Sequence, residues 1–179
     1  WHVYRQGARW RRSRSSAWAV LSGGGWEAVQ FGGPTLEVIA TDRLRRDPRI
    51  ARLGPDVLAD RFDEDAAVAA IRADPTRAVG DALLHQRLVA GIGNIFKSEA
   101  CFAARVDPWR GVWDLSEEEL RGVLSAARDL MLAAVESGRH PHEVYRRRQG
   151  TCPRCRGRIS SRGQGDANRT TYWCPRCQL

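Results

Sequence analysis

Two Cys-x-x-Cys pairs near the end of the chain constrain its fold more than any other feature. Cys152 and Cys155 form the first pair, and Cys174 and Cys177 form the second after an interval of eighteen residues. This spacing is typical of a four-thiolate zinc site in which a β-hairpin brings two tight turns together. Two disulfides are the alternative, but nothing in the sequence indicates secretion. We therefore expect one structural zinc ion.

Positive charge accompanies these cysteines. Residues 139–179 hold ten arginines and two acidic residues, a net charge of 10 − 2 = +8, whereas residues 1–138 hold 19 basic and 19 acidic residues. The formal charge of the chain therefore falls on and beside the zinc module, which favours nucleic acid over a membrane as the partner. No apolar run approaches the length of a membrane span, and no signal-peptide pattern is present, so we expect a cytoplasmic protein.

The first part of the chain has the pattern of a β-sheet. Four strand-like runs lie at residues 1–4, 16–21, 26–31 and 36–39, and glycine-rich turns separate the last three. Four strands in so short a segment cannot easily bury both faces. We therefore expect residues 1–45 to be a partial β-sandwich and residues 46–62 to be a charged linker. The tryptophans of this part are expected in the core or on a sheet face: Trp1, Trp10, Trp18 and Trp26.

Helical spacing replaces the strand pattern after the linker. Asp63 is predicted to cap a helix through residue 73, Thr76 a second through residue 88, and Asn94 a third through residue 104. A capping box at Ser116 and Glu119 starts a fourth helix, which we expect to end at Gly138. The sequence thus predicts an α+β fold with a helical domain at residues 63–145 and a zinc finger at residues 146–179.

The turn before the third helix has the composition of a phosphate-binding site. Gly91 and Gly93 can adopt positive φ and allow another backbone to approach closely. Asn94 would then cap the helix, whose free amides point outward, and could donate its own side-chain amide to a phosphate. An ordinary corner between two helices, with glycines used only for geometry, is the alternative.

Two segments resemble the formamidopyrimidine-DNA glycosylase / endonuclease VIII family. The first, which begins at Gln86 and includes residues 91–99, is similar to the helix–two-turn–helix motif of that family, and residues 169–178 are similar to its C-terminal zinc finger. Residues 53–56 resemble the usual entry into its helical domain. The tail and the early strands favour the endonuclease VIII branch.

The resemblance implies a base-excision repair protein that binds double-stranded DNA containing a damaged base or an abasic site. It implies that Asn94 holds a phosphate and that Arg169 grips the phosphates flanking the damaged nucleotide. Gln86 and Lys97 would lie near the same backbone, beside Gly91 and Gly93. We expect a monomer that acts in the bacterial cytoplasm, in association with the nucleoid.

Catalytic residues of that family cannot be placed in this chain. Its members begin with a proline, whose amine attacks the damaged nucleotide, followed by a glutamate. This chain begins at Trp1, and its amines are the α-amino group and Lys97. Imine chemistry needs a nucleophilic amine. We therefore predict a DNA-binding part of a bifunctional DNA glycosylase / abasic-site lyase with little activity of its own and no catalytic residue.

Three alternatives remain at this stage. The chain could be a non-catalytic, zinc-dependent nucleic-acid-binding module, a zinc-ribbon protein of transcription or translation, or an iron–thiolate electron carrier. Cys101 lies among apolar neighbours and is expected to be a small buried hydrophobe. His140 and His142 are expected at the surface, since four thiolates already complete a tetrahedral zinc site.

Overall fold

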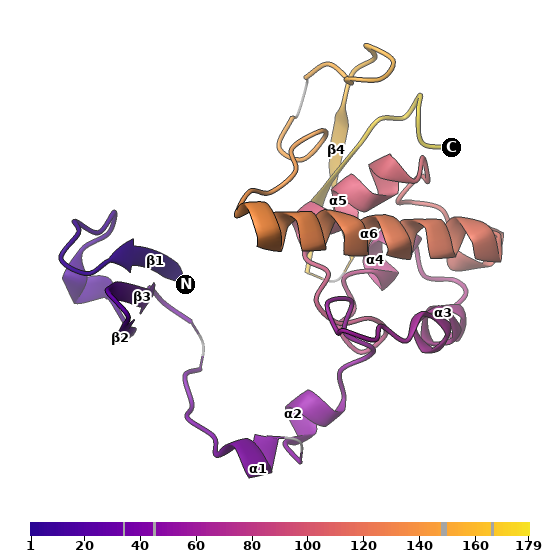
Figure 1. Ribbon diagram of the computed structural model, residues 1–179. Coiled ribbons are helices and arrows are strands. Elements are labelled where there is room, and N and C mark those ends of the chain that lie inside the picture. Colours follow the sequence, from indigo (N-terminus) through magenta and orange to yellow (C-terminus); the bar gives the residue numbers. More distant parts are fainter. Residues whose placement is uncertain (34, 45, 148–149, 166) are drawn as a thin grey trace. The chain divides into compact units, whose positions relative to one another are not determined.

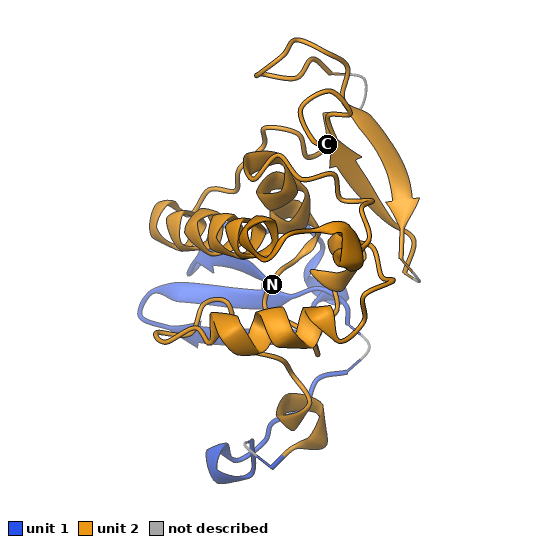
Figure 2. Cartoon of the chain, turned by 90° about the vertical axis from the view of Figure 1, so that its right-hand side faces the viewer, with its two compact units in different colours: residues 1–46 blue, residues 47–179 orange. Residues whose placement is uncertain are grey.

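The computed structural model describes residues 1–33, 35–44, 46–147, 150–165 and 167–179, and the chain forms two compact units (Figure 2). The first unit, residues 1–46, contains a three-stranded antiparallel sheet. The sheet has the order β1-β3-β2, with β1 (His2–Arg5), β2 (Ala19–Gly23) and β3 (Trp26–Gln30). Gly24 and Gly25 join β2 to β3 with φ of 56° and 78°, which a two-residue hairpin turn requires.

One expectation for this unit is wrong: residues 36–39 form no strand, and Val38 is fully exposed. Of the four tryptophans, Trp10 is buried at 9% exposure, and Trp26 lies on the face of β3 at 46% exposure. Trp1 and Trp18, which precede β1 and β2, are 59% and 56% exposed. A single sheet has no second layer to cover them. A short 3-10 helix, η1 (Arg14–Ser16), precedes β2.

Two short helices lie near the predicted boundary between the sandwich part and the linker. They are α1 (Thr41–Leu44), before the predicted linker, and α2 (Pro48–Ala51), within it. Asp47 caps α2, and its Oδ1 accepts a hydrogen bond from the Arg49 amide at 2.8 Å. The nearby Arg49 guanidinium also lowers the pKa of Asp47 to about 2.

The second unit, residues 47–179, is mainly helical (Figure 1). Besides α2, its helices are α3 (Glu64–Arg72), α4 (Val79–Ala82), α5 (Asn94–Ala103) and α6 (Glu117–Ser137), with the 3-10 helix η2 (Val112–Asp114) before α6. The Asp63 cap of α3 and the capping box of α6 are as predicted, and Gly138 ends α6 with φ of 66°. The buried stripe of α6 consists of Leu120, Val123, Leu124, Ala127 and Met131.

The helix predicted between Thr76 and residue 88 is largely absent. Only α4 is helical there, and its N-cap is Ala78. The backbone amides of Val79 and Gly80 donate to the carbonyls of Arg110 and Pro108, at 2.9 and 3.0 Å. Because this segment pairs with residues 108–111, it cannot begin a helix at Thr76.

The C-terminal hairpin completes the unit. Strand β4 (Ser160–Gln164) pairs antiparallel with β5 (Arg169–Trp173), with Gln164 opposite Arg169. A small core of Phe102, Val144, Cys152, Ile159 and Cys174 joins this zinc module to α5. The α+β fold class is therefore confirmed. Among the described residues, none of the helices combines the length and the apolar character that crossing a membrane requires.

Candidate metal centre and nucleic-acid interface

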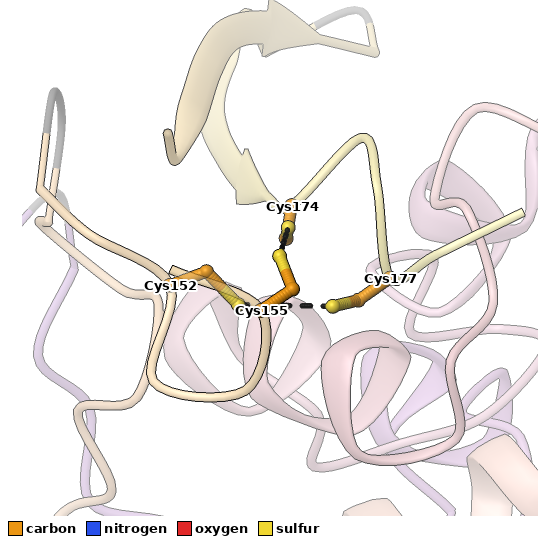
Figure 3. A group of neighbouring side chains, drawn as sticks. All are labelled: Cys152, Cys155, Cys174 and Cys177. Carbon is orange, nitrogen blue, oxygen red and sulfur yellow. Dashed lines mark hydrogen bonds between the residues drawn. The ribbon is translucent and has the colours of Figure 1, made fainter. Parts of the chain in front are cut away.

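The four predicted cysteines converge at one point. Cys152 and Cys155 lie on a loop before β4, Cys174 follows β5, and Cys177 lies on the next turn (Figure 3). Their sulfur atoms all lie within 4.8 Å of one another. The Cys152–Cys177 and Cys155–Cys174 sulfur pairs are 3.8 and 3.5 Å apart. A tetrahedral zinc ion with Zn–S bonds of about 2.3 Å needs sulfurs about 3.8 Å apart, so the site fits zinc.

Backbone and side-chain contacts shape this metal centre. The Gly157 amide donates to Cys155 Sγ at 3.4 Å and is the main reason why the pKa of Cys155 falls to about 7, which favours the thiolate. The buried Gln178 accepts from the Cys174 amide at 2.8 Å and donates to the Val106 carbonyl at 2.9 Å. The side chain after the last cysteine thus ties the metal site to the end of α5.

Helix α5 begins at the predicted glycine turn. Gly91 has φ of 98°, as predicted, but Gly93 has φ of −101° and is itself the N-cap, so Asn94 is the first helical residue and not the cap. No side chain caps the first turn of α5 among the described residues. A Cβ atom added at Gly93 would meet no atom within 4 Å, so neither its backbone conformation nor internal packing requires glycine there. Within the part of the chain that the structure describes, the first turn of α5 thus begins without a side-chain cap, and the space beside Gly93 is open.

Gln86 and Asn94 make contacts within the protein. The Gln86 amide donates to the carbonyls of Leu84 and Ile92, and its oxygen accepts from the Gly91 amide at 2.9 Å, so Gln86 closes the turn. Asn94 Nδ2 donates to the Thr170 carbonyl at 2.8 Å. The amide that we expected to reach a phosphate thus joins α5 to β5 instead.

Lys97 does not lie on the surface, where we expected a contact with DNA. It is completely buried, and its ammonium group donates to Gln164 Oε1 at 3.3 Å and to Thr171 Oγ1. Gln164 accepts from Thr171 at 2.7 Å and donates to the Pro108 carbonyl at 2.7 Å. Burial lowers the pKa of Lys97 to about 8, so its charge is costly at neutral pH.

Arg169 is exposed at the start of β5, beside the hairpin turn. Among the described residues, no carboxylate lies within ion-pair distance of its guanidinium. The side chain borders a cavity of about 230 Å³, which it shares with Arg77, Asp81 and His85. Asp81 is paired with Arg77 at 2.6 Å, so Arg169 keeps a free positive charge next to this cavity.

Sequence reasoning did not identify the buried polar residues that hold the modules together. Glu99, only 2% exposed, accepts hydrogen bonds from the amides of residues 143–145 at 2.8–3.1 Å. Gln164 and Thr171 had no distinctive spacing. Polar residues at alternate positions of the hairpin were the only available signal, and that pattern equally fits a solvated face.

Comparison with known proteins places this geometry in one family. The pattern of the formamidopyrimidine-DNA glycosylase H2TH domain matches residues 53–145, and that of the zinc finger found in FPG and IleRS matches residues 150–179. The chain belongs to the formamidopyrimidine-DNA glycosylase / endonuclease 8 family. The resemblance proposed from the sequence is therefore confirmed.

Relatives in this family come from diverse bacteria. The chain is 36% identical over 189 residues to the "Probable endonuclease 8 2" of Streptomyces coelicolor, with 99% of this chain and 68% of that protein covered. It is 35% identical over 153 residues to the formamidopyrimidine-DNA glycosylase of Thermus thermophilus, with 75% and 56% covered. The chain therefore spans between about half and two thirds of the length of these family members.

Solved structures of the family share the fold. The MutM (Fpg) protein of Thermus thermophilus superposes with a TM-score of 0.75 at 30% identity, over 93% of this chain and 70% of that one. The Lactococcus lactis Fpg, in a complex with DNA containing an abasic site, gives a TM-score of 0.78 at 22% identity, over 99% and 70%.

Proposed function

We propose that this chain is the damaged-DNA-binding part of a bifunctional DNA glycosylase / abasic-site lyase in base-excision repair. Its partner would be duplex DNA that contains a damaged base or an abasic site, in the cytoplasm of a bacterium. The observation that carries the proposal is the start of α5, where uncapped amides and an unobstructed Gly93 form a place for a phosphate group.

Arg169 would supply a second phosphate contact, and a hydrogen bond links its strand to the start of α5. Arg169 lies one residue before Thr170, whose carbonyl accepts from Asn94 Nδ2 at the start of α5. The hydrogen bond therefore fixes the position of the Arg169 backbone relative to the glycine turn. Two phosphate contacts held at a set separation suit a protein that bends DNA in order to extrude a nucleotide.

We assign to these 179 residues the holding of DNA and not the bond-breaking step. Lyase chemistry proceeds through an amine, and Lys97 is the single lysine of the chain. Lys97 is buried and hydrogen-bonded inside the protein, where a sugar carbon cannot reach it.

The Gly93→Ala variant tests the phosphate site. A methyl group at this position has space within the protein, and φ of −101° suits alanine, but the methyl would stand where a phosphate must approach. We expect the Kd for a duplex with an abasic-site analogue to rise about tenfold, as measured by fluorescence anisotropy. The loss of stability should stay below about 1 kcal/mol, the usual cost of alanine at an N-cap.

Gly122→Ala is the matched control, because Gly122 lies on α6 and a Cβ there also meets nothing within 4 Å. This control should bind DNA like the unmodified chain. Equal affinities for all three proteins would reject the phosphate site at α5. An unmodified chain that does not prefer the lesion duplex over a plain duplex would reject the proposed function itself.

A further inference from the structure

Positive charge also gathers in the first unit, contrary to the expectation that it lies only on the zinc module. Residues 1–46 contain eight arginines and three acidic residues, a net charge of 8 − 3 = +5. Residues 47–138 contain 11 basic and 16 acidic residues, a net charge of 11 − 16 = −5. The two sums cancel, and for this reason residues 1–138 look neutral when they are taken together.

Half of the arginines of the first unit lie on one loop between β1 and β2. Arg9, Arg11, Arg12 and Arg14 are all exposed. Among the described residues, no carboxylate lies within ion-pair distance of these four guanidinium groups. We call residues 9–14 the arginine loop. Four free guanidinium groups within six residues repel one another, so the folded loop carries an electrostatic cost that an anionic ligand would relieve.

Buried aromatic contacts hold the arginine loop in place. Trp10 points inward, donates its indole N–H to Glu27 Oε2 at 2.9 Å, and packs on Tyr4 and Phe31 with ring centroids 6.0 and 5.8 Å apart. The Arg14 guanidinium lies 4.3 Å from the centre of the Trp10 ring. Stacking of this kind orders an arginine side chain without neutralising it.

The loop also encloses space. A cavity of about 490 Å³ is lined by residues 7–14, and Arg12 lies over the Phe31 ring at 5.6 Å on its border. We propose that the arginine loop binds the phosphates of duplex DNA and is a second contact surface besides the glycine turn and the zinc hairpin. Planar guanidinium groups bind phosphate oxygens through paired hydrogen bonds, and the loop offers several at once. This inference rests on the proposed function.

The charge-removal variant Arg11→Gln/Arg12→Gln tests the proposal. Its matched control is Arg43→Gln/Arg46→Gln, which removes the same charge from exposed positions of the same unit outside the loop. The Kd for an abasic-site duplex is measured in the full chain at several salt concentrations. We expect the slope of log K against log salt to fall by about 2 for the loop variant and by less than 1 for the control, because each lost phosphate contact removes about 0.9.

A second variant separates charge from folding. Arg11→Lys/Arg12→Lys keeps both charges and should retain most of the slope, whereas a loss equal to that of the glutamine pair would overturn the proposal. Equal slopes for the loop variant and its control, with Arg169→Ala still losing about 1, would overturn the proposal and leave the proposed function intact. Loop-dependent binding to phosphatidylglycerol vesicles without a loop effect on DNA would also overturn it. If the unmodified chain bound no duplex DNA, that result would reject the proposed function itself.

Discussion

Lys97 shows how far burial can change the role of a residue. Its ammonium group has two neutral oxygen partners and, among the described residues, no carboxylate in ion-pair contact. Loss of hydration, with a smaller contribution from Arg169, lowers the pKa of Lys97 to about 8 and outweighs the upward effects of Cys101 and Asp81. A buried ammonium of this kind makes folding depend on pH.

The sign of that dependence follows from the two states. In the unfolded chain Lys97 keeps its proton up to about pH 10.5, whereas in the folded chain it loses the proton near pH 8. Between these values the unfolded state binds more protons, so stability should rise with pH by at most about 3 kcal/mol. Urea unfolding of the chain and of Lys97→Met between pH 7 and 10 measures this.

The free energy of unfolding of the unmodified chain should rise with pH, and that of Lys97→Met should lack this rise. Cys101, whose pKa burial raises to about 12, acts in the opposite direction above pH 9, but it is present in both proteins. Parallel stability curves for the two proteins would contradict the assignment of a buried, charged Lys97.

The roles of the metal ligands could be predicted from the sequence. The roles of residues that depend on which segments pack around them could not. Cys152 and its three partners were predictable because metal ligation sets both their type and their spacing. Gln86 and Lys97 were expected at the DNA surface because they lie near the glycine turn along the chain. Spacing does not reveal which side of a turn the hairpin covers, and β5 covers Lys97.

At the scale of elements, local sequence patterns predicted a helix correctly where no distant segment competed for its backbone hydrogen bonds. Helix α6 was predictable because its capping box, its apolar stripe and its terminal glycine all agree. The helix expected after Thr76 had only a predicted cap residue, and residues 79 and 80 hydrogen-bond to the distant residues 110 and 108. The sequence contains no local sign of that pairing, which explains the wrong prediction.

Zinc removal should unfold the zinc module and spare the helices. The module has a small core, and two of its five buried members are zinc ligands. Metal ligation supplies most of the folding free energy in such a module. We expect chelation to collapse the dispersed amide resonances of residues 150–179 in NMR spectra while those of α3 and α6 persist. A hairpin that stays intact in chelator would contradict this.

At the scale of the whole molecule, the chain combines the proposed DNA-binding surfaces with a single lysine, Lys97, that is buried. Borohydride reduction in the presence of abasic-site DNA traps any imine between an amine and the sugar. We expect Lys97 to form no covalent product with the sugar, since it is buried. Lys97→Met should behave identically. Strong trapping by both proteins would point to the α-amino group, and trapping that Lys97→Met abolishes would contradict the burial of Lys97.

Family and fold class were accessible from the sequence, but a charge sum over residues 1–138 combined two parts of opposite sign. The sum over residues 1–138 is zero because an arginine-rich first unit is offset by the acidic starts of helices such as α3 and α6. Residues 1–46, 47–138 and 139–179 carry net charges of +5, −5 and +8, so only the middle segment is acidic. A total taken along a chain hides such a separation whenever two oppositely charged parts adjoin.

Helix α5 hydrogen-bonds to the hairpin through Asn94 and Lys97. Through Glu99 it also accepts hydrogen bonds from the backbone of residues 143–145, which precede the metal site. On the proposed function, bound metal and bound DNA would both stabilise this arrangement of residues. Thermodynamic linkage requires such effects to be mutual, so each ligand would strengthen the binding of the other. Scarcity of zinc in a cell would consequently weaken recognition of the phosphate backbone even at contacts that no cysteine touches.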